Sequence, residues 1–207
     1  MIEWMISKEE LGLYTVASKI PGLINTFVNI FSQAWGISSI KEIESTNDVV
    51  YFSKVFQIYS ALSFGAAIFF IAITKPFMSL YVGADFTAAW HYVPLLLTAA
   101  SLSAVSAYFG SMFGALKRSV ECMWSTIIGA IANVALNYFC IKMIGTWGAI
   151  VGTVCAFLII AIVRIVWVGH YINVKLYWGQ LIIDIMIALG QGILVTLDWN
   201  VAAVSAV

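Results

Sequence analysis

Long, uninterrupted apolar segments recur from one end of this sequence to the other, and they limit what the chain can fold into. A helix needs about 20 apolar residues to cross the hydrocarbon core of a bilayer, and these segments reach that length. The strands of a membrane barrel would instead alternate apolar and polar residues over about ten positions. The sequence therefore predicts an all-α, polytopic transmembrane helical bundle.

Polar residues and turn signals divide the apolar sequence into about six predicted spans. An N-terminal segment of residues 1–10 precedes them, a tail of residues 198–207 follows, and the spans cover residues 11–40, 55–74, 93–116, 120–141, 147–168 and 181–197. Lys75-Pro76 is expected to end the second span, because proline disrupts a helix. The segment 77–91, with Gly83 and Asp85, is expected to lie at the membrane interface.

The charge content excludes several classes of protein. Only 10% of the residues are charged, whereas soluble domains carry about 25%, so most of the surface is expected to face lipid. The formal net charge is zero. Because no basic field is present to attract phosphates, we expect no nucleic-acid partner.

The residue types that commonly carry metal or catalytic chemistry are scattered along the chain. Cys122, Cys140 and Cys155 lack the spacing of metal ligands, and His91 and His170 lie far apart in the sequence. No nucleophile elbow, phosphate-binding loop or plausible pair of carboxylates is present. We therefore expect no metal, no cofactor and no enzymatic active site.

The basic residues between the spans predict the orientation of the chain. If the first span runs inward, the inner side holds Lys41, Lys54, Lys117, Arg118, Arg164 and Lys175, and the outer side holds Lys8, Lys75 and Lys142. This excess on the inner side predicts an extracytoplasmic N-terminal segment. Since residues 1–10 do not form a signal peptide, we expect a further helix upstream.

The first span has a polar face. Residues at steps of four, three, four, three and four place on one side Ser18, Gly22, Asn25, Asn29, Ser32 and Gly36. Such a face can line a water-filled cavity or pack against another helix, and the pattern fits both. Asn25, Asn29 and the adjacent Gln33 are the candidate cavity-lining residues. Lys19 can contact an anionic head group or extend to the membrane surface.

Polar and small residues in the later spans predict helix contacts. Asn133 and Asn137 share a face and are expected to hydrogen-bond to a neighbouring helix. A stripe of small residues at Gly148, Gly152 and Ala156 predicts close helix packing. Arg164 and Asp184 are expected to form an ion pair near the cytoplasmic side; a coupling proton on Asp184 is the alternative.

Four stretches carry a resemblance to a known family. They are residues 11–21 (LGLYTVASKIP), Phe31-x-x-Ala34-Trp35 with Lys41-Glu42, residues 90–96 (WHYVPLL), and the series Gly129, Asn133, Asn137, Gly145, Gly148-Ala149, Gly152-Thr153. From Leu11 to about His170, the chain resembles the C-terminal half of bacterial polysaccharide-biosynthesis flippases. These belong to the multidrug/oligosaccharidyl-lipid/polysaccharide exporter superfamily.

The resemblance implies a transporter of two lobes, each of about six helices, which face each other across a central cavity. Such a protein moves an undecaprenyl-pyrophosphate-linked oligosaccharide across the bacterial inner membrane by alternating access, for polysaccharide or O-antigen synthesis. The family's N-terminal lobe is absent from this sequence, so the expected partners are the lipid-linked oligosaccharide, the lipid bilayer, and a separate N-terminal lobe or second copy. The alternatives are a cation-coupled drug exporter of the same superfamily, a membrane enzyme of the same sugar pathway, and a non-functional fragment.

Overall fold

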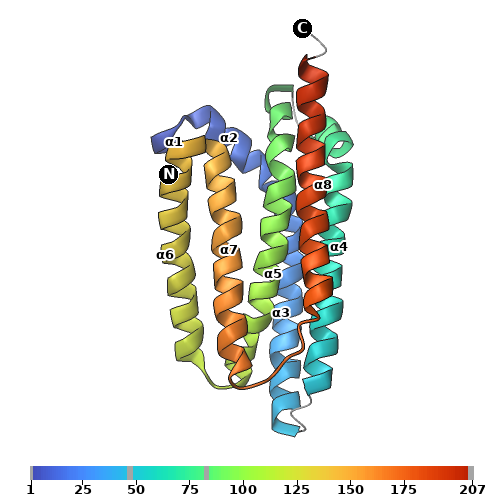
Figure 1. Ribbon diagram of the computed structural model, residues 1–207, viewed down its shortest axis with the longest axis vertical. Coiled ribbons are helices and arrows are strands. Elements are labelled where there is room, and N and C mark those ends of the chain that lie inside the picture. Colours follow the sequence, from blue (N-terminus) through green and yellow to red (C-terminus); the bar gives the residue numbers. More distant parts are fainter. Residues whose placement is uncertain (1, 46–48, 82–83, 205–207) are drawn as a thin grey trace.

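The computed structural model describes residues 2–45, 49–81 and 84–204, and within them every regular element is helical (Figure 1). The elements are α1 (Ile2–Met5), α2 (Lys8–Ala17), α3 (Lys19–Ser45), α4 (Val49–Tyr81), the 3-10 helix η1 (Ala84–Tyr92), α5 (Val93–Ala115), α6 (Ser119–Ile144), α7 (Thr146–Gly169) and α8 (Trp178–Val204). The predicted all-α class is confirmed.

Five helices in the described part of the chain are long and apolar enough to cross a membrane. They are Val49–Met78, Ala88–Ala115, Ser119–Ile144, Thr146–Gly169 and Trp178–Thr196. This makes the chain a multi-pass membrane protein. The first predicted span, residues 11–40, corresponds mainly to α3, which runs beside the others but is not among the five. Its asparagine, glutamine and serine residues lower its hydropathy.

The predicted first span, residues 11–40, is broken into two helices. Ser7 caps the N-terminus of α2, because its hydroxyl accepts a hydrogen bond from the Glu10 backbone N–H at 3.1 Å. The helix ends before Ser18, and α3 begins at Lys19. Pro21 lies in the first turn of α3, where its missing N–H costs no helical hydrogen bond. The break lets α2 lie across the bundle while α3 runs along it (Figure 1).

The expected end of the second span at Lys75-Pro76 was wrong, because α4 continues through Pro76 to Tyr81. Helices in membranes tolerate an internal proline when neighbouring groups satisfy the carbonyl that it leaves free. Residues 77–81 therefore belong to α4, and the rest of the predicted interfacial segment contains η1. The predicted tail also differs, since α8 continues to Val204.

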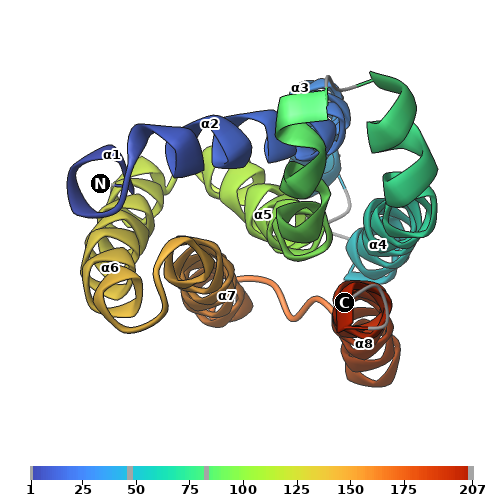
Figure 2. The same cartoon turned by 90° about the horizontal axis from the view of Figure 1, so that it is seen from above.

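The helices form an arc around α5 (Figure 2). Seen from above, α6, α7, α5 and α3 follow one another, α4 and α8 cover the other side of α5, and α2 crosses from α6 towards α3. Of the 18-residue apolar segment that qualifies each helix as a membrane span, 78% is buried in the helix that contains α5, but only 11% in α6. The central helix is thus α5, whereas α6 has the outermost position on one side.

Aromatic side chains fill the contact between α3, α4 and α5. The rings of Phe31 and Tyr59 stack with centroids 4.0 Å apart, and those of Trp35 and Tyr108 with centroids 4.9 Å apart. Tyr108 is fully buried, and its hydroxyl donates a hydrogen bond of 2.7 Å to the Phe52 carbonyl. We call these five residues the aromatic core.

Glycines allow α6 and α7 to pack closely. A Cβ at Gly148 would overlap the backbone of Cys140, and one at Gly152 would lie 3.0 Å from the backbone nitrogen of Asn137. The close packing predicted from the small-residue stripe is confirmed at these two positions. Gly145 connects the two helices with φ +61°, a conformation that favours glycine.

The basic residues between the helices lie at the two ends of the bundle, on the sides that the predicted spans assign to them. The end with α2 is called the upper end, and the end with the α5–α6 turn the lower end (Figure 1). Lys117 and Arg118 lie at the lower end, whereas Lys8 and Lys142 lie at the upper end. The lower end thus corresponds to the predicted inner side of the membrane.

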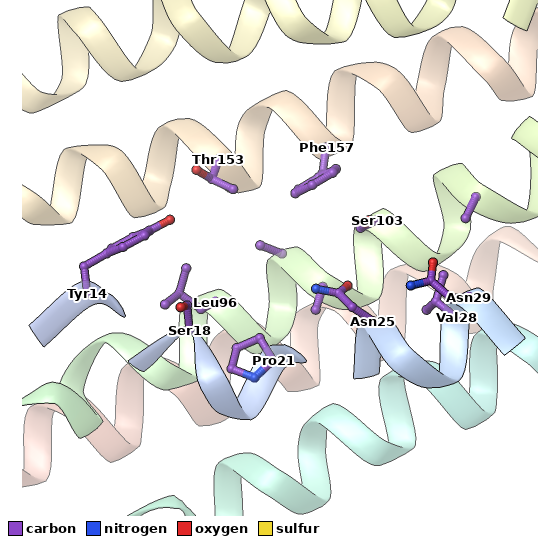
Figure 3. A pocket seen from close by; sticks show the side chains of 13 residues that line it. Tyr14, Ser18, Pro21, Asn25, Val28, Asn29, Leu96, Ser103, Thr153 and Phe157 are labelled. Atoms are coloured by element: carbon purple, nitrogen blue, oxygen red, sulfur yellow. The ribbon is translucent and has the colours of Figure 1, made fainter. Parts of the chain in front are cut away.

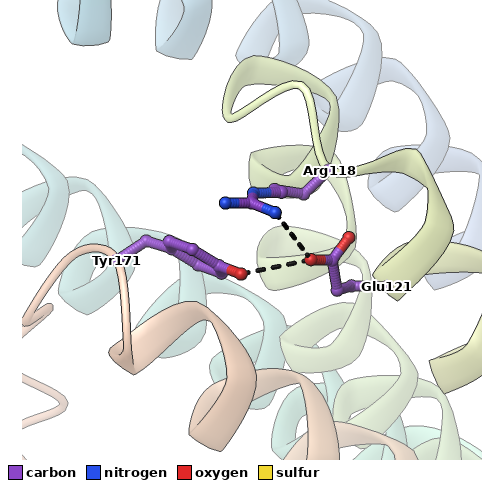
Figure 4. A network of polar contacts seen from close by, with 3 residues as sticks. All are labelled: Arg118, Glu121 and Tyr171. Atoms are coloured by element: carbon purple, nitrogen blue, oxygen red, sulfur yellow. Dashed lines mark hydrogen bonds and ion pairs between the residues drawn. The ribbon is translucent and has the colours of Figure 1, made fainter.

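Polar contacts connect helices at both ends. At the lower end, Glu121 accepts a hydrogen bond from Tyr171 at 3.1 Å and pairs with Arg118 at 3.4 Å, and the Arg118 guanidinium lies over the Tyr171 ring (Figure 4). At the upper end, Glu10 accepts hydrogen bonds from Tyr92 at 2.9 Å and Thr146 at 2.7 Å. The Glu10 contacts join α2, η1 and α7.

Candidate functional site

A polar groove lies on the concave side of the arc, below α2. It consists of three adjoining cavities of about 440, 450 and 290 Å³. Tyr14 and Thr153 line all three, so the cavities meet where α2 crosses α7. These three cavities together are called the groove.

One wall of the groove belongs to α3 and presents free amide groups. Ser18, Asn25 and Asn29 line the cavity of about 440 Å³, as the stripe on the first span predicts for a cavity-facing helix. Both asparagines are exposed. Among the described residues, neither has a hydrogen-bond partner. Their donors and acceptors are therefore available to a ligand.

The floor of the groove is α5, where small side chains leave room. Ala99, Ala100, Ser103 and Ala107 line it between α3 and α7. Larger residues at these positions would fill the space between the two walls. The groove exists because α5 carries bulky aromatics towards α4 and small residues towards α7.

The opposite wall and the upper boundary come from α7 and α2. Figure 3 shows Thr153 and Phe157 on α7 facing Asn25 and Asn29 on α3. Tyr14 reaches from α2 towards Thr153 (Figure 3). The Thr153 hydroxyl donates to the Ala149 carbonyl at 2.7 Å, so its oxygen still has acceptor capacity for a ligand.

Asn133 and Asn137 line the part of the groove between α6 and α7. The expectation that they hydrogen-bond to a neighbouring helix was wrong: the Asn137 amide donates to Asn133 Oδ1 at 3.0 Å within α6. Asn137 Oδ1 is buried without a partner. The close approach of Gly152 to Asn137 explains this, since α7 presents no donor at that point.

Lys19 and Gln33, the other two candidate residues on the first span, lie outside the lining of the groove. Both side chains are exposed. Lys19 begins α3 directly after Ser18, at the edge of the groove. Gln33 lies one turn beyond Asn29, towards the lower end.

The expected ion pair between Arg164 and Asp184 does not form. Arg164 donates to the Ser125 hydroxyl at 3.1 Å, to the Ser106 carbonyl at 2.9 Å and to the Thr126 hydroxyl at 2.9 Å. One carboxylate oxygen of Asp184 is buried without a hydrogen-bond partner. The reason is geometric: α7 packs against α5 and α6, whereas α8 packs against α4 and α5.

Four further residues line the groove without being predicted to do so: Tyr14, Ser103, Thr153 and Phe157. A signal for the α5 floor is present in residues 98–107 (TAASLSAVSA), whose small side chains leave space beside a buried helix. Tyr14 has no comparable signal, because its position depends on the break between α2 and α3.

The groove is electrically neutral in its lining: amide, hydroxyl and apolar groups surround it, and among the described lining residues none is charged. Such a lining suits an uncharged polar ligand that both donates and accepts hydrogen bonds.

When the chain was compared with protein-family models, with curated proteins and with solved structures, none matched.

Proposed function

We propose that this chain forms one lobe of a bacterial inner-membrane transporter that translocates a lipid-linked oligosaccharide, such as an undecaprenyl-pyrophosphate-linked repeat unit, for polysaccharide or O-antigen synthesis. The observation that carries the proposal is the neutral polar groove with unpaired amides inside a bundle of membrane-length apolar helices. The resemblance of the sequence to the oligosaccharide flippases supports the same function.

The chemistry of the groove matches that of a sugar. Each sugar hydroxyl donates and accepts hydrogen bonds, and an asparagine amide offers two donors and an acceptor. Hydrocarbon offers neither, so moving a sugar through lipid without such groups costs several kcal/mol per unpaired polar group. Asn25 and Asn29, one turn apart on α3, provide successive contacts along the groove.

The groove supplies one side of a translocation path. Its wall on α3 is exposed rather than enclosed, and a polar wall facing lipid is unfavourable. A second lobe, either a separate N-terminal lobe or another copy of this chain, would enclose the path. Lys19 is exposed directly after Ser18, and its ammonium group would contact the pyrophosphate.

The neutral lining favours this proposal over the two rivals with a defined chemistry. A cation-coupled drug exporter would use an acidic side chain in its binding cavity, and the described lining contains none. A sugar-pathway enzyme would need catalytic acids, bases or metal ligands, and amides and hydroxyls serve binding better than proton transfer.

The test is translocation of a labelled polyprenyl-pyrophosphate oligosaccharide in liposomes, measured as the loss of accessibility to an external glycosidase. The assembled two-lobe transporter with the wild-type chain is expected to accelerate exchange between leaflets. Asn25→Leu and Asn29→Leu are each expected to lower the rate about tenfold, since each removes hydrogen bonds to the sugar. Asn173→Leu, at an exposed position in the α7–α8 connection, is the matched control.

Membrane insertion and folded yield of each variant are measured alongside. Wild-type translocation by a folded Asn25→Leu/Asn29→Leu double variant would show that this face only packs against protein. Exchange no faster than in protein-free liposomes would reject the transport function itself.

A further inference from the structure

Arg164 is a membrane-depth cation that has only neutral partners. Its guanidinium donates to the hydroxyls of Ser125 and Thr126, and to the carbonyl and hydroxyl oxygens of Ser106. Among the described residues, no carboxylate lies in ion-pair contact with it. A charge within a membrane protein is costly unless an opposite charge or water compensates it, so this arrangement leaves a positive charge without a counter-ion.

A separate cavity lies beside this guanidinium, between the lower ends of α5 and α6. Its volume is about 430 Å³, and its lining includes Gly110, Ser111, Gly114, Ser119, Thr126 and Ile127. We call it the α5–α6 cavity. Its lining has three hydroxyl groups and two glycines: the Ser111 and Thr126 hydroxyls donate to backbone carbonyls of their own helices, the Ser119 hydroxyl keeps its donor, and the glycines leave open space.

Two lining residues connect the cavity directly to Arg164. Thr126 accepts a hydrogen bond of 2.9 Å from Nη2 of Arg164. Gly110 has no side chain, and Nη1 of Arg164 occupies the space that a Cβ there would take. The positive charge therefore lies immediately behind the cavity wall. Arg164 is only half-buried, so it is not sealed from its surroundings.

The depth of the cavity matches the boundary between hydrocarbon and head groups. α7 ends at Gly169, five residues after Arg164, which places Arg164 about 7 to 8 Å from the end of the helix. The α5–α6 turn, with Lys117 and Arg118, lies at the same lower end. Glu121 lies in the same stretch of α6 as the cavity lining, but its carboxylate already pairs with Arg118 and accepts a hydrogen bond from Tyr171.

We propose that the α5–α6 cavity binds a phosphate group, supplied in the membrane by an anionic phospholipid, with Arg164 as its counter-charge. Guanidinium groups attract phosphate through charge-assisted hydrogen bonds, and Nη2 of Arg164 keeps one N–H beyond the one that it donates to Thr126. The Ser119 hydroxyl in the lining adds a donor. The acyl chains would lie along the exposed apolar surface of α6, which includes Val120 and Ile127. This site shares Thr126 with the lining of the groove, but it does not depend on the proposed function.

A purely structural role predicts a different behaviour. Hydroxyl and carbonyl partners could hold three helices together equally well with a neutral hydrogen-bond donor, without the cost of a buried charge. If Arg164 only braces α5, α6 and α7, its removal lowers stability equally in every lipid. If it binds phosphate, the stabilisation by an anionic lipid disappears.

The experiment measures the thermal unfolding midpoint of the purified protein in an uncharged detergent. Three additions are compared: phosphatidylglycerol, phosphatidylcholine with the same acyl chains, and sodium phosphate at matched ionic strength. At about ten times its dissociation constant, phosphatidylglycerol is expected to raise the wild-type midpoint by about 2 to 5 °C, and phosphatidylcholine to leave it unchanged. An equal shift with sodium phosphate would support the site with the free ion as its ligand, whereas equal shifts with both lipids would overturn the proposal.

Two variants locate the site. Arg164→Gln removes the charge, and Gly114→Leu fills the cavity mouth without touching Arg164, since nothing lies within 4 Å of a Cβ there. Both are expected to lose the shift with phosphatidylglycerol, while Gly65→Leu, at an equally open position on α4, is expected to keep it. If Arg164→Gln does not fold, Gly114→Leu decides: a full phosphatidylglycerol shift in that variant would overturn the proposal.

Discussion

The aromatic core between α3, α4 and α5 and the glycine contact between α6 and α7 achieve close packing in opposite ways. In the first, large rings such as Tyr108 and Trp35 fill the space between helices. In the second, Gly148 and Gly152 leave no side chain to fill, and the two backbones approach directly. The groove lies between these two regions, and small residues of α5 form its floor.

The difference shows how each region can fail. Lipid is as apolar as a helix surface, so contact between helices depends on van der Waals packing rather than on expulsion of water. The aromatic core is therefore damaged by removing atoms, which leaves a void. The glycine contact is damaged by adding atoms, which pushes the backbones apart.

The largest effect is expected from removing a ring of the aromatic core. Tyr108→Ala should lower the free energy of unfolding by about 3 to 5 kcal/mol, because it leaves a cavity among three helices and removes the hydrogen bond to Phe52. Chemical unfolding in detergent micelles measures this. Tyr138→Ala, at an exposed position on α6, should cost less than about 1 kcal/mol. Equal losses at the two positions would refute the contrast.

An intermediate effect is expected from adding one methyl group at the glycine contact. Gly148→Ala should cost about 1 to 3 kcal/mol, since the new Cβ would overlap the backbone of Cys140 and neither backbone can yield freely. Gly65→Ala, in open space on α4, should instead gain up to about 1 kcal/mol from helix propensity. The same unfolding measurement applies, and a gain at Gly148 would show that the contact is loose.

The smallest effect is expected at the partly exposed polar contact between the lower ends of α6 and α7. Glu121→Gln removes the charge that pairs with Arg118 and weakens the hydrogen bond from Tyr171 at the lower end. Partly exposed ion pairs contribute little, so the loss should be no more than about 1 kcal/mol and should shrink at high salt. A loss above about 2 kcal/mol that is independent of salt would mean that this contact, rather than packing, holds α6 in place.

Some element boundaries were predictable from local signals alone. The observed limits of α5, α6 and α7 lie within three residues of the predicted spans, because polar residues or Gly145 interrupt the apolar sequence at both ends. The limits of α4 were missed, since whether a helix passes through Pro76 depends on what its neighbours satisfy. The break before Lys19 was missed for a similar reason: a continuous apolar sequence does not show where a helix ends and a second helix begins in a new direction.

The candidate site was partly predictable. Asn25 and Asn29 stood out because amides are rare within apolar helices, and the structure places both in the lining of the groove. Thr153 and Ser103 did not stand out, since hydroxyl groups often bond within their own helix and are common in membrane spans. The Arg164–Asp184 pair was wrong because nearness along the chain does not specify which helices become neighbours.

By itself, the sequence determined that the chain is a helical membrane protein, the location of the five segments that are apolar enough to span, and which face of α3 is polar. These properties depend on the free energy of transferring side chains and backbone from water to lipid, and this free energy is a sum over neighbouring residues in the sequence. Only the tertiary structure decided that α5 is the central helix, that the groove runs between α3 and α7, and that Arg164 faces hydroxyls instead of Asp184. Those outcomes depend on how side chains of distant segments fit together, and a linear pattern of polarity does not contain that shape.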